Sequence, residues 1–242
     1  MRKTTRRYDK YKDSNIEWIG EIPEHWEIKK IKDLLVNGTS GMRIGPFGSS
    51  LKSEMMKEKG YKVYGQENVI NDDFTAGHRY IDESKFQEME RYELLSGDIV
   101  VTMMGTVGKS KVVPENIEKG IMDSHLIRIR VGKAISNLQL LALSINESEY
   151  IQNQRKVLTK GSIMEGLNSR IIQSLFVITP PLSEQKAIAL YLDTKTAQID
   201  RKIDLLTQKA KRYEELKRAI VNETVTGRRR IDNGELIIDN GK

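Results

Sequence analysis

The sequence contains no cysteine, and this absence excludes several kinds of chemistry at once. Structural disulfides, thiolate zinc sites, iron–sulfur clusters and cysteine nucleophiles all require a thiol. Histidine is also scarce, with 3 residues scattered at positions 25, 78 and 125, so we expect no histidine-rich metal site.

Long apolar runs are absent as well. The run at residues 175–178 is among the longest, and it is far shorter than a membrane-spanning helix. The basic N-terminus is not followed by the apolar stretch of a signal peptide. We therefore expect a soluble chain without a membrane partner, located in the cytoplasm.

The charge of the chain is basic but unevenly distributed. Lys and Arg number 40 against 34 Asp and Glu, which gives a formal net charge of +6 and a pI of about 9.2. Cations are concentrated in residues 1–12, and residues 228–230 form a second cluster of three arginines. Either cluster alone is typical of a solvated chain end. Together they favour a polyanionic partner such as double-stranded DNA.

The pattern of residues divides the chain into four segments. A basic leader covers residues 1–14, a strand-rich domain residues 15–182, a long helix residues 183–226 and a tail residues 227–242. We expect Trp18 and Trp26 to anchor the N-terminal part onto the domain. This organisation predicts an α+β fold, with a strand-rich recognition domain followed by a long coiled-coil-forming helix.

Within the domain, short β-type runs alternate with glycine-rich loops. We predict strands at residues 61–64, 98–103, 111–113, 126–131 and 175–179. One helix is expected from residue 137 to about residue 156, because apolar residues recur there near helical spacing. In the tail, Ile231 and residues 236–238 are candidates for a small hairpin or an edge strand.

The long helix is predicted to begin with Ser183 as its N-cap and to end near Gly227. No glycine or proline interrupts about 40 residues, so the helix would be about 60 Å long. Apolar residues recur at threes and fours, which favours a coiled-coil strand over a helix packed on its own domain. A single seam needs a partner helix, so we expect a dimer or a bundle. The seam residues are Ile188, Leu192, Ile199, Ile203, Leu206, Ala210, Tyr213 and Ile220.

No catalytic site is expected. The segment at residues 105–110 ends like a phosphate-binding Walker A loop, but Met103 stands where that motif requires glycine. The segment Thr179-Pro180-Pro181-Leu182 resembles the Asn/Asp-Pro-Pro-aromatic motif of amino-methyltransferases. Thr179 and Leu182 suit neither the amine-holding nor the base-stacking role, and no glycine-rich cofactor loop precedes them.

The remaining candidates form a binding surface. Glycine, Lys or Arg, and Ser, Gln or Asn recur together in three loops, which favours a polyanion site over solvated loops. Phosphate contacts are expected from Arg43, Lys52, Lys109 and Lys160, and base contacts from residues near Ser49, Gln66, Asn68 and Thr106. The full set of candidate DNA-binding residues is Arg43, Ser49, Ser50, Lys52, Gln66, Asn68, Thr106, Lys109, Ser110, Lys160 and Ser162.

Five groups of residues, in the order of the chain, resemble the specificity subunit of type I restriction-modification systems. The resemblance extends over nearly the whole sequence. Its most specific part is the run Pro180-Pro181-Leu182-Ser183-Glu184-Gln185-Lys186-Ala187-Ile188-Ala189, which resembles the start of that family's helical spacer. The other groups are Tyr11 to Glu27, Pro46-Phe47-Gly48-Ser49-Ser50-Leu51, Ser96-Gly97-Asp98-Ile99 and Gly105-Thr106-Val107-Gly108.

The resemblance implies a DNA-recognition subunit that is not itself an enzyme. In this family, target recognition domains each read one half of a split DNA sequence, and helical spacers pair antiparallel. Methyltransferase subunits bring S-adenosylmethionine, and a restriction subunit can bring a nuclease with an ATP- and Mg-dependent motor. No cofactor is then expected on this chain.

One departure from the family pattern is that the sequence shows one recognition domain and one spacer rather than two of each. This suggests a half-subunit that forms a homodimer and reads an interrupted palindrome. Two alternatives stay open: a truncated fragment that acts as an interaction or decoy protein, and a nuclease or methyltransferase in its own right.

Overall fold

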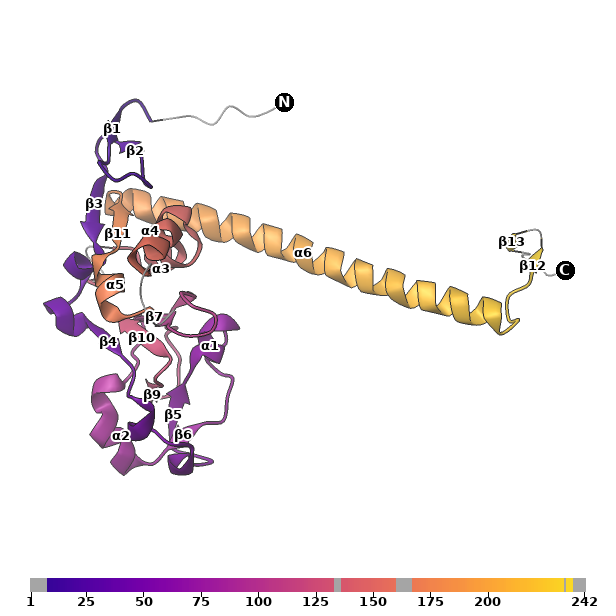
Figure 1. Ribbon diagram of the computed structural model, residues 1–242, viewed down its shortest axis with the longest axis horizontal. Coiled ribbons are helices and arrows are strands. Elements are labelled where there is room, and N and C mark those ends of the chain that lie inside the picture. Colours follow the sequence, from indigo (N-terminus) through magenta and orange to yellow (C-terminus); the bar gives the residue numbers. More distant parts are fainter. Residues whose placement is uncertain (1–7, 133–135, 160–166, 233, 237–242) are drawn as a thin grey trace. The chain divides into compact units, whose positions relative to one another are not determined.

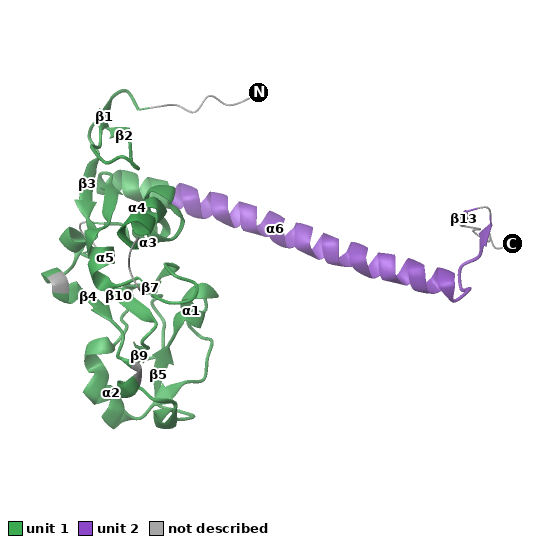
Figure 2. Cartoon of the chain, viewed as in Figure 1, with its two compact units in different colours: residues 1–189 green, residues 190–242 purple. Residues whose placement is uncertain are grey.

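The computed structural model describes residues 8–132, 136–159, 167–232 and 234–236 (Figure 1). The chain divides into two compact units, residues 1–189 and residues 190–242 (Figure 2). The helices are α1 (Gln66–Ile70), α2 (Glu83–Met89), α3 (Leu138–Glu147), α4 (Glu149–Thr159), α5 (Ser169–Ser174) and α6 (Leu182–Val225). The strands are β1 (Tyr11–Asp13), β2 (Glu21–Pro23), β3 (Glu27–Lys30), β4 (Met42–Ile44), β5 (Tyr61–Tyr64), β6 (Tyr80–Ile81), β7 (Ile99–Thr102), β8 (Ser110–Val112), β9 (Gly120–Met122), β10 (Leu126–Ile129), β11 (Phe176–Thr179), β12 (Ile231–Asp232) and β13 (Glu235–Leu236).

A four-stranded antiparallel sheet, in the order β4-β10-β7-β8, forms the centre of the first unit. Successive side chains of a strand point to opposite faces of a sheet. On β10, Ile127 and Ile129 therefore face one apolar cluster, whereas Leu126 faces a second cluster on the other side. The sheet is buried on both faces, which explains why β7 is a continuous apolar run, Ile99-Val100-Val101.

Each face of this sheet is covered by a different set of elements. The first cluster includes residues of α3, α4, α5 and β11, together with the short 3₁₀ helix Ile31–Leu34. The second cluster includes residues of α2 and of a three-stranded sheet in which β5 lies between β6 and β9. The pairing of β5 with β9 is parallel, whereas β5 and β6 are antiparallel.

The N-terminal aromatic segment is anchored to the first turn of α6. Glu184 accepts hydrogen bonds from Trp26 Nε1 at 3.0 Å and from the Tyr8 hydroxyl at 3.0 Å, and its Oε1 lies 2.7 Å from His25 Nε2. The strand β3, which follows, pairs with β11 just before α6 begins. These contacts confirm the predicted anchor for Trp26, and the anchoring role of Trp18 stays a prediction.

Two predictions about the helices are wrong in detail. The helix expected over residues 137–156 is two helices, because Ser148 adopts an extended conformation (φ −76°, ψ 130°) between α3 and α4. Its predicted start is correct, since the Asn137 side chain accepts a hydrogen bond from Leu140 N. The long helix begins at Leu182, so Ser183 is its second residue rather than its N-cap.

The second unit contains most of α6 and a small hairpin. The predicted 183–226 helix is confirmed within one residue at each end, and Gly227 follows it with φ +70°, which terminates the helix. The strands β12 and β13 pair antiparallel, as the tail pattern suggested. Among the described residues, no helix is both long enough and apolar enough to cross a membrane.

Candidate nucleic-acid interface

Four segments of the first unit meet at one edge of the central sheet. Three of them follow β4, β5 and β7, and the fourth is residues 123–125, which join β9 to β10. Backbone hydrogen bonds connect them: Gly45 N to Leu126 O, Asp123 N to Tyr64 O, and Met103 N to His125 O, each at 2.8 or 2.9 Å. We call residues 45–52, 65–68, 103–109 and 123–125 the loop edge. It contains three of the predicted glycine-rich or amide-bearing segments.

The first segment of the loop edge lies directly on residues 123–125. A Cβ atom on Gly45 would lie 1.7 Å from the carbonyl oxygen of Asp123, so only glycine permits this approach. Beyond it, Ser49, Ser50 and Lys52 are exposed, and their predicted contacts with DNA stay a prediction. The turn is closed by a hydrogen bond from Ser50 N to Phe47 O.

Phe47 is a candidate that the sequence reasoning missed. Its ring is 81% exposed at this turn, which is unusual for a large apolar side chain. It lies beside the two serines in the segment Pro46 to Leu51, one of the segments that resemble the family. The glycine-rich setting of this segment was a signal from which its exposure could have been predicted.

Arg43 lies on β4 opposite Arg128 of β10. Its side chain is partly buried, and its Nε has no hydrogen-bond partner among the described residues. Arg128, by contrast, donates to the backbone carbonyls of Arg91 and Glu93. Burial and the neighbouring cations Arg130 and Arg43 lower the pKa of Arg128. A phosphate contact by Arg43 stays a prediction.

Asn68 does not face solvent, and this contradicts its predicted role in reading bases. Its side chain is 1% exposed. The carbonyl oxygen accepts from Gly65 N at 2.9 Å, and the amide nitrogen donates to Asp73 O and Ala76 O, both at 2.9 Å. All of the amide hydrogens are thus used inside the protein. Gln66 is partly exposed, and its buried Oε1 has no partner among the described residues.

A charged cluster forms around Arg79. Arg79 donates to Asp123 Oδ2 at 2.9 Å and to Glu67 Oε1 at 2.7 Å. Burial opposes the charge of Arg79, but the two carboxylates outweigh it and raise the pKa of the guanidinium. His125 lies next to this cluster, with Nδ1 at 3.4 Å from Asp123 Oδ1, and its ring is 45% exposed. His125 was missed as well, although its place in a short polar link between two strands was a usable signal.

The remaining candidates lie in or next to the loop between β7 and β8, and they differ in whether they are exposed or buried. Thr106 is exposed, and its carbonyl oxygen accepts from Thr102 Oγ1. Lys109 is half-exposed, with Nζ at 3.5 Å from Glu147 Oε1. Ser110 is buried, and its hydroxyl donates to Ala142 O at 2.6 Å, which contradicts its predicted place on the binding surface.

The base of this loop is fixed by α4. Arg155 donates to Val107 O at 3.0 Å, and burial lowers its pKa. A Cβ on Gly108 would lie 2.0 Å from the Arg155 guanidinium, and Gly108 has φ +84°. Lys160 and Ser162, the candidates of the third glycine loop, lie outside the described residues.

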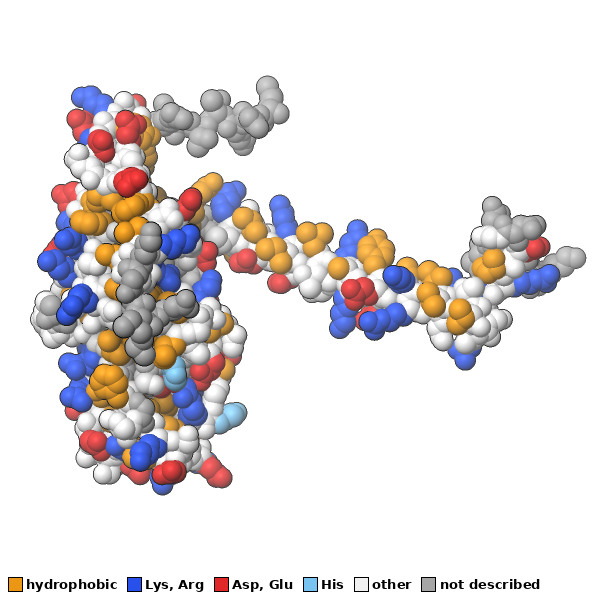
Figure 3. Space-filling view, viewed as in Figure 1, with side chains coloured by type: hydrophobic (Ala, Val, Ile, Leu, Met, Phe, Trp, Pro, Cys, Tyr) orange, Lys and Arg blue, Asp and Glu red, His pale blue; other side chains and the backbone are white. Residues whose placement is uncertain are grey.

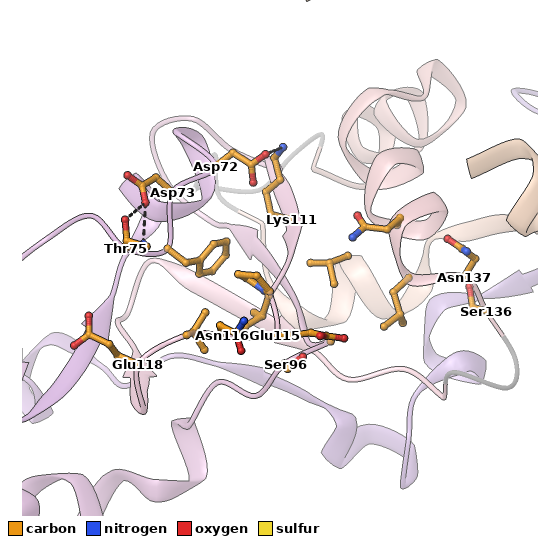
Figure 4. Close-up of a pocket in the computed structure, with 18 of the residues that line it drawn as sticks. Asp72, Asp73, Thr75, Ser96, Lys111, Glu115, Asn116, Glu118, Ser136 and Asn137 are labelled. Atoms are coloured by element: carbon orange, nitrogen blue, oxygen red, sulfur yellow. Dashed lines mark hydrogen bonds and ion pairs between the residues drawn. The ribbon is translucent and has the colours of Figure 1, made fainter. Parts of the chain in front are cut away.

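A separate polar pocket of about 810 Å³ lies on the same unit (Figure 4). Acidic residues Asp72, Asp73, Glu115 and Glu118 line it, and Lys111 is held by Asp72 at 2.6 Å. The carboxylates would repel a phosphate backbone, so this pocket does not suit DNA. No group of His, Asp and Glu suited to a metal ion occurs among the residues that the structure describes.

The chain combines a loop edge on a buried sheet with a long helix, and its sequence places it in a family of DNA specificity domains. Residues 23–215 match the family model described as "Type I restriction modification DNA specificity domain". The chain belongs to this family.

Curated relatives agree with the family match. The chain is 27% identical over 222 residues to the type I restriction enzyme MjaVIII specificity subunit of Methanocaldococcus jannaschii, covering 89% of this chain and 49% of that protein. It is 28% identical over 213 residues to the putative type I restriction enzyme MjaX specificity subunit of the same organism, covering 83% and 48%. The chain thus spans about half the length of these relatives. Both names denote specificity subunits, the class that the sequence resembles.

Solved structures show the same fold. A chain from a structure of complex assembly and conformational transition in a type I R-M system has a TM-score of 0.65 at 15% identity, covering 84% of this chain and 46% of that one. The HsdS subunit from Thermoanaerobacter tengcongensis has a TM-score of 0.54 at 16% identity, covering 78% and 41%. The predicted fold class is confirmed by these likenesses.

Proposed function

We propose that this chain reads one half of a split DNA target through its loop edge and pairs with a second copy of itself through α6. Two identical recognition domains related by a two-fold axis would read an interrupted palindrome. The observation that carries the DNA-reading part is the convergence of exposed Phe47, Ser49, Ser50, Lys52 and Thr106 on one edge of a rigid sheet.

The partners and cofactors in this proposal follow the family resemblance. Methyltransferase subunits would supply S-adenosylmethionine, and a restriction subunit would supply the ATP- and Mg-dependent nuclease. This chain would bind neither cofactor and would act in the cytoplasm. The two matched relatives are themselves named specificity subunits, which supports the assignment of this chain as a recognition subunit.

The phosphate role of Lys52 provides a direct test of the loop edge. Lys52 is exposed and has no ion-pair partner among the described residues. Lys52→Ala should weaken DNA binding by a similar factor on every sequence and reduce the slope of log affinity against log salt by about 1. The measurement is a salt titration of binding in the assembled complex with the methyltransferase subunit.

Lys32 offers a matched control for this test. It is also exposed, but it lies at the other end of the sheet, where Leu35 bridges Val131 beyond the end of β10. Lys32→Ala should leave both affinity and salt slope unchanged. Equal effects of the two substitutions, or a change by Lys52→Ala at one base position only, would contradict the assignment.

The homodimer is tested by light scattering of the purified chain, alone and with the methyltransferase subunit. A mass twice the 27.7 kDa of one chain supports it. A monomer that stays monomeric with that subunit refutes the homodimer and favours the truncated, interaction-only alternative.

A further inference from the structure

The part of α6 beyond the first unit carries a regular apolar row that is exposed from Ile199 onward. Positions 192, 199, 206, 213 and 220 recur every seventh residue and are all apolar. Ile199, Leu206 and Tyr213 are 55%, 66% and 58% exposed. Figure 3 shows hydrophobic side chains exposed along this helix. In heptad terms these are the d positions, and the a positions are Thr196, Ile203, Ala210, Lys217 and Thr224.

The charges that flank this row are distributed asymmetrically. One side, the g positions, carries Lys195, Lys202 and Lys209 and ends in Glu223. The other side, the e positions, carries Asp193, Asp200 and Glu214. In an antiparallel pair of helices g positions face g positions and e positions face e positions, so the register decides which charges meet.

We propose that two copies of α6 pair antiparallel about a two-fold axis that passes between Lys211 and Arg212, so that residues equally far from this axis meet in the core. This inference rests on the proposed homodimer and specifies its contacts. On both sides of the axis, Lys202 then faces the partner's Glu223, and no like charges oppose each other at the e and g positions. The charge pattern of the helix points to this register.

The core layers in this register combine residues of complementary size and polarity. Small Ala210 lies against the partner's Tyr213, and Ile203 lies against the partner's Ile220. Lys217 lies against the partner's Leu206, where its methylene chain can cover apolar surface while the ammonium reaches water. Every layer between Ile199 and Thr224 therefore contains at least one apolar side chain.

Neighbouring antiparallel registers are less favourable. A shift by one heptad toward the N-terminus opposes Asp200 to the partner's Glu214 and Lys209 to its own copy. A shift by one heptad the other way opposes Glu214 to its own copy and moves Ile203 opposite Gly227, beyond the end of α6. Like charges at these positions destabilise a pair of helices.

A parallel, in-register pair is the main competitor. It would join Lys195 to the partner's Asp200 and Lys209 to the partner's Glu214. However, it would also stack Lys217 on Lys217 inside the seam, oppose the small Ala210 to itself and crowd two Tyr213 rings. These layers leave a buried like-charge pair and an unfilled space, both of which destabilise a core.

Charge reversal tests the register. Lys202→Glu should raise the dimer dissociation constant about tenfold, since two attractive pairs become repulsive, and the double variant Lys202→Glu with Glu223→Lys should restore it. Lys195→Glu is the matched control: Lys195 meets no charge of the partner helix in this register, but it pairs with Glu223 or Asp200 in the competing arrangements. Loss of dimer with Lys195→Glu, or no rescue by the double variant, overturns the register.

Disulfide trapping tests the same contacts by distance, because the sequence contains no cysteine of its own. Ile203→Cys and Ile220→Cys chains, co-expressed with different tags, should form a mixed disulfide on oxidation. Neither variant alone should cross-link. Leu206→Cys alone should not cross-link either, whereas a parallel dimer would join it to its copy.

The outcomes separate the register from the homodimer. A monomer in light scattering overturns the homodimer and the register together. The same conclusion holds if the chain associates only with a methyltransferase subunit or with a longer specificity subunit. A stable dimer that fails the charge rescue or shows the Leu206→Cys cross-link overturns the register alone.

Discussion

Asp98 is expected to be among the most important polar residues for the stability of the recognition unit. It stands directly before β7 and is 2% exposed. Its carboxylate accepts from Arg130 Nε at 2.7 Å and Nη2 at 2.8 Å, and from Leu95 N at 2.9 Å. This bidentate bond to Asp98 raises the pKa of Arg130, although burial opposes the shift. Asp98→Ala would leave the guanidinium and one backbone amide without their acceptor.

The expected loss of stability depends on how much hydration each group regains once it has lost its partner. Breaking a fully buried ion pair costs about 3–5 kcal/mol. Arg130 is 33% exposed and recovers part of its hydration, so we expect about 2–3 kcal/mol for Asp98→Ala. For a unit of this size that corresponds to a fall in Tm of roughly 4–12 °C. Thermal unfolding followed by tryptophan fluorescence measures it, because Trp18 and Trp26 both belong to this unit.

Asp72→Ala is the matched control for this prediction. Its carboxylate lies 2.6 Å from Lys111 Nζ, closer than any Asp98 contact, but the Asp72 side chain is 61% exposed. Exposed pairs contribute about 0–1 kcal/mol, so Tm should hardly change. If the two variants lower Tm equally, the reasoning from burial is refuted.

Two further predictions concern the contacts that hold other parts of the recognition unit. Gly45→Ala should destabilise the recognition unit by about 1–3 kcal/mol and weaken DNA binding, because the new Cβ would overlap the Asp123 carbonyl. Urea unfolding and a DNA-binding titration measure the two effects. If neither stability nor binding changes, the prediction is wrong. Burial raises the pKa of Glu184, but hydrogen bonds from His25, Trp26 and Tyr8 outweigh it and lower that pKa. The contacts of Glu184 with the N-terminal segment should therefore be intact at neutral pH and be lost as the pH falls through the lowered pKa of Glu184. Trp26 fluorescence should change over that pH range in the native chain. The Glu184→Gln variant should not show this change.

Local patterns in the sequence predicted several elements well. The strand at residues 61–64 coincides with β5, and the helix start at Asn137 and the extent of α6 were also correct. These elements depend on alternation, capping and helical spacing, which are properties of neighbouring residues. The break at Ser148 was missed because neither glycine nor proline marks it.

The candidate site was predicted by residue type but not by burial. Asn68 and Ser110 have the side chains of a binding loop, yet the fold uses both inside the protein. Phe47 and His125 reach the loop edge only because segments far apart in the sequence end at the same side of the sheet. Such convergence is a tertiary property, and no spacing of residues within a single segment encodes it.

In the loops that contain Phe47 and Thr106, these two residues form hydrogen bonds through their main-chain atoms. Phe47 contributes its carbonyl oxygen to the turn with Ser50, and Thr106 contributes its carbonyl oxygen to Thr102. Among the described residues, neither side chain has a hydrogen-bond partner, so we expect both positions to tolerate replacement without loss of the framework. A library of variants at these two positions could therefore be screened for altered target preference in chains that still fold, which makes this edge a practical starting point for retargeting.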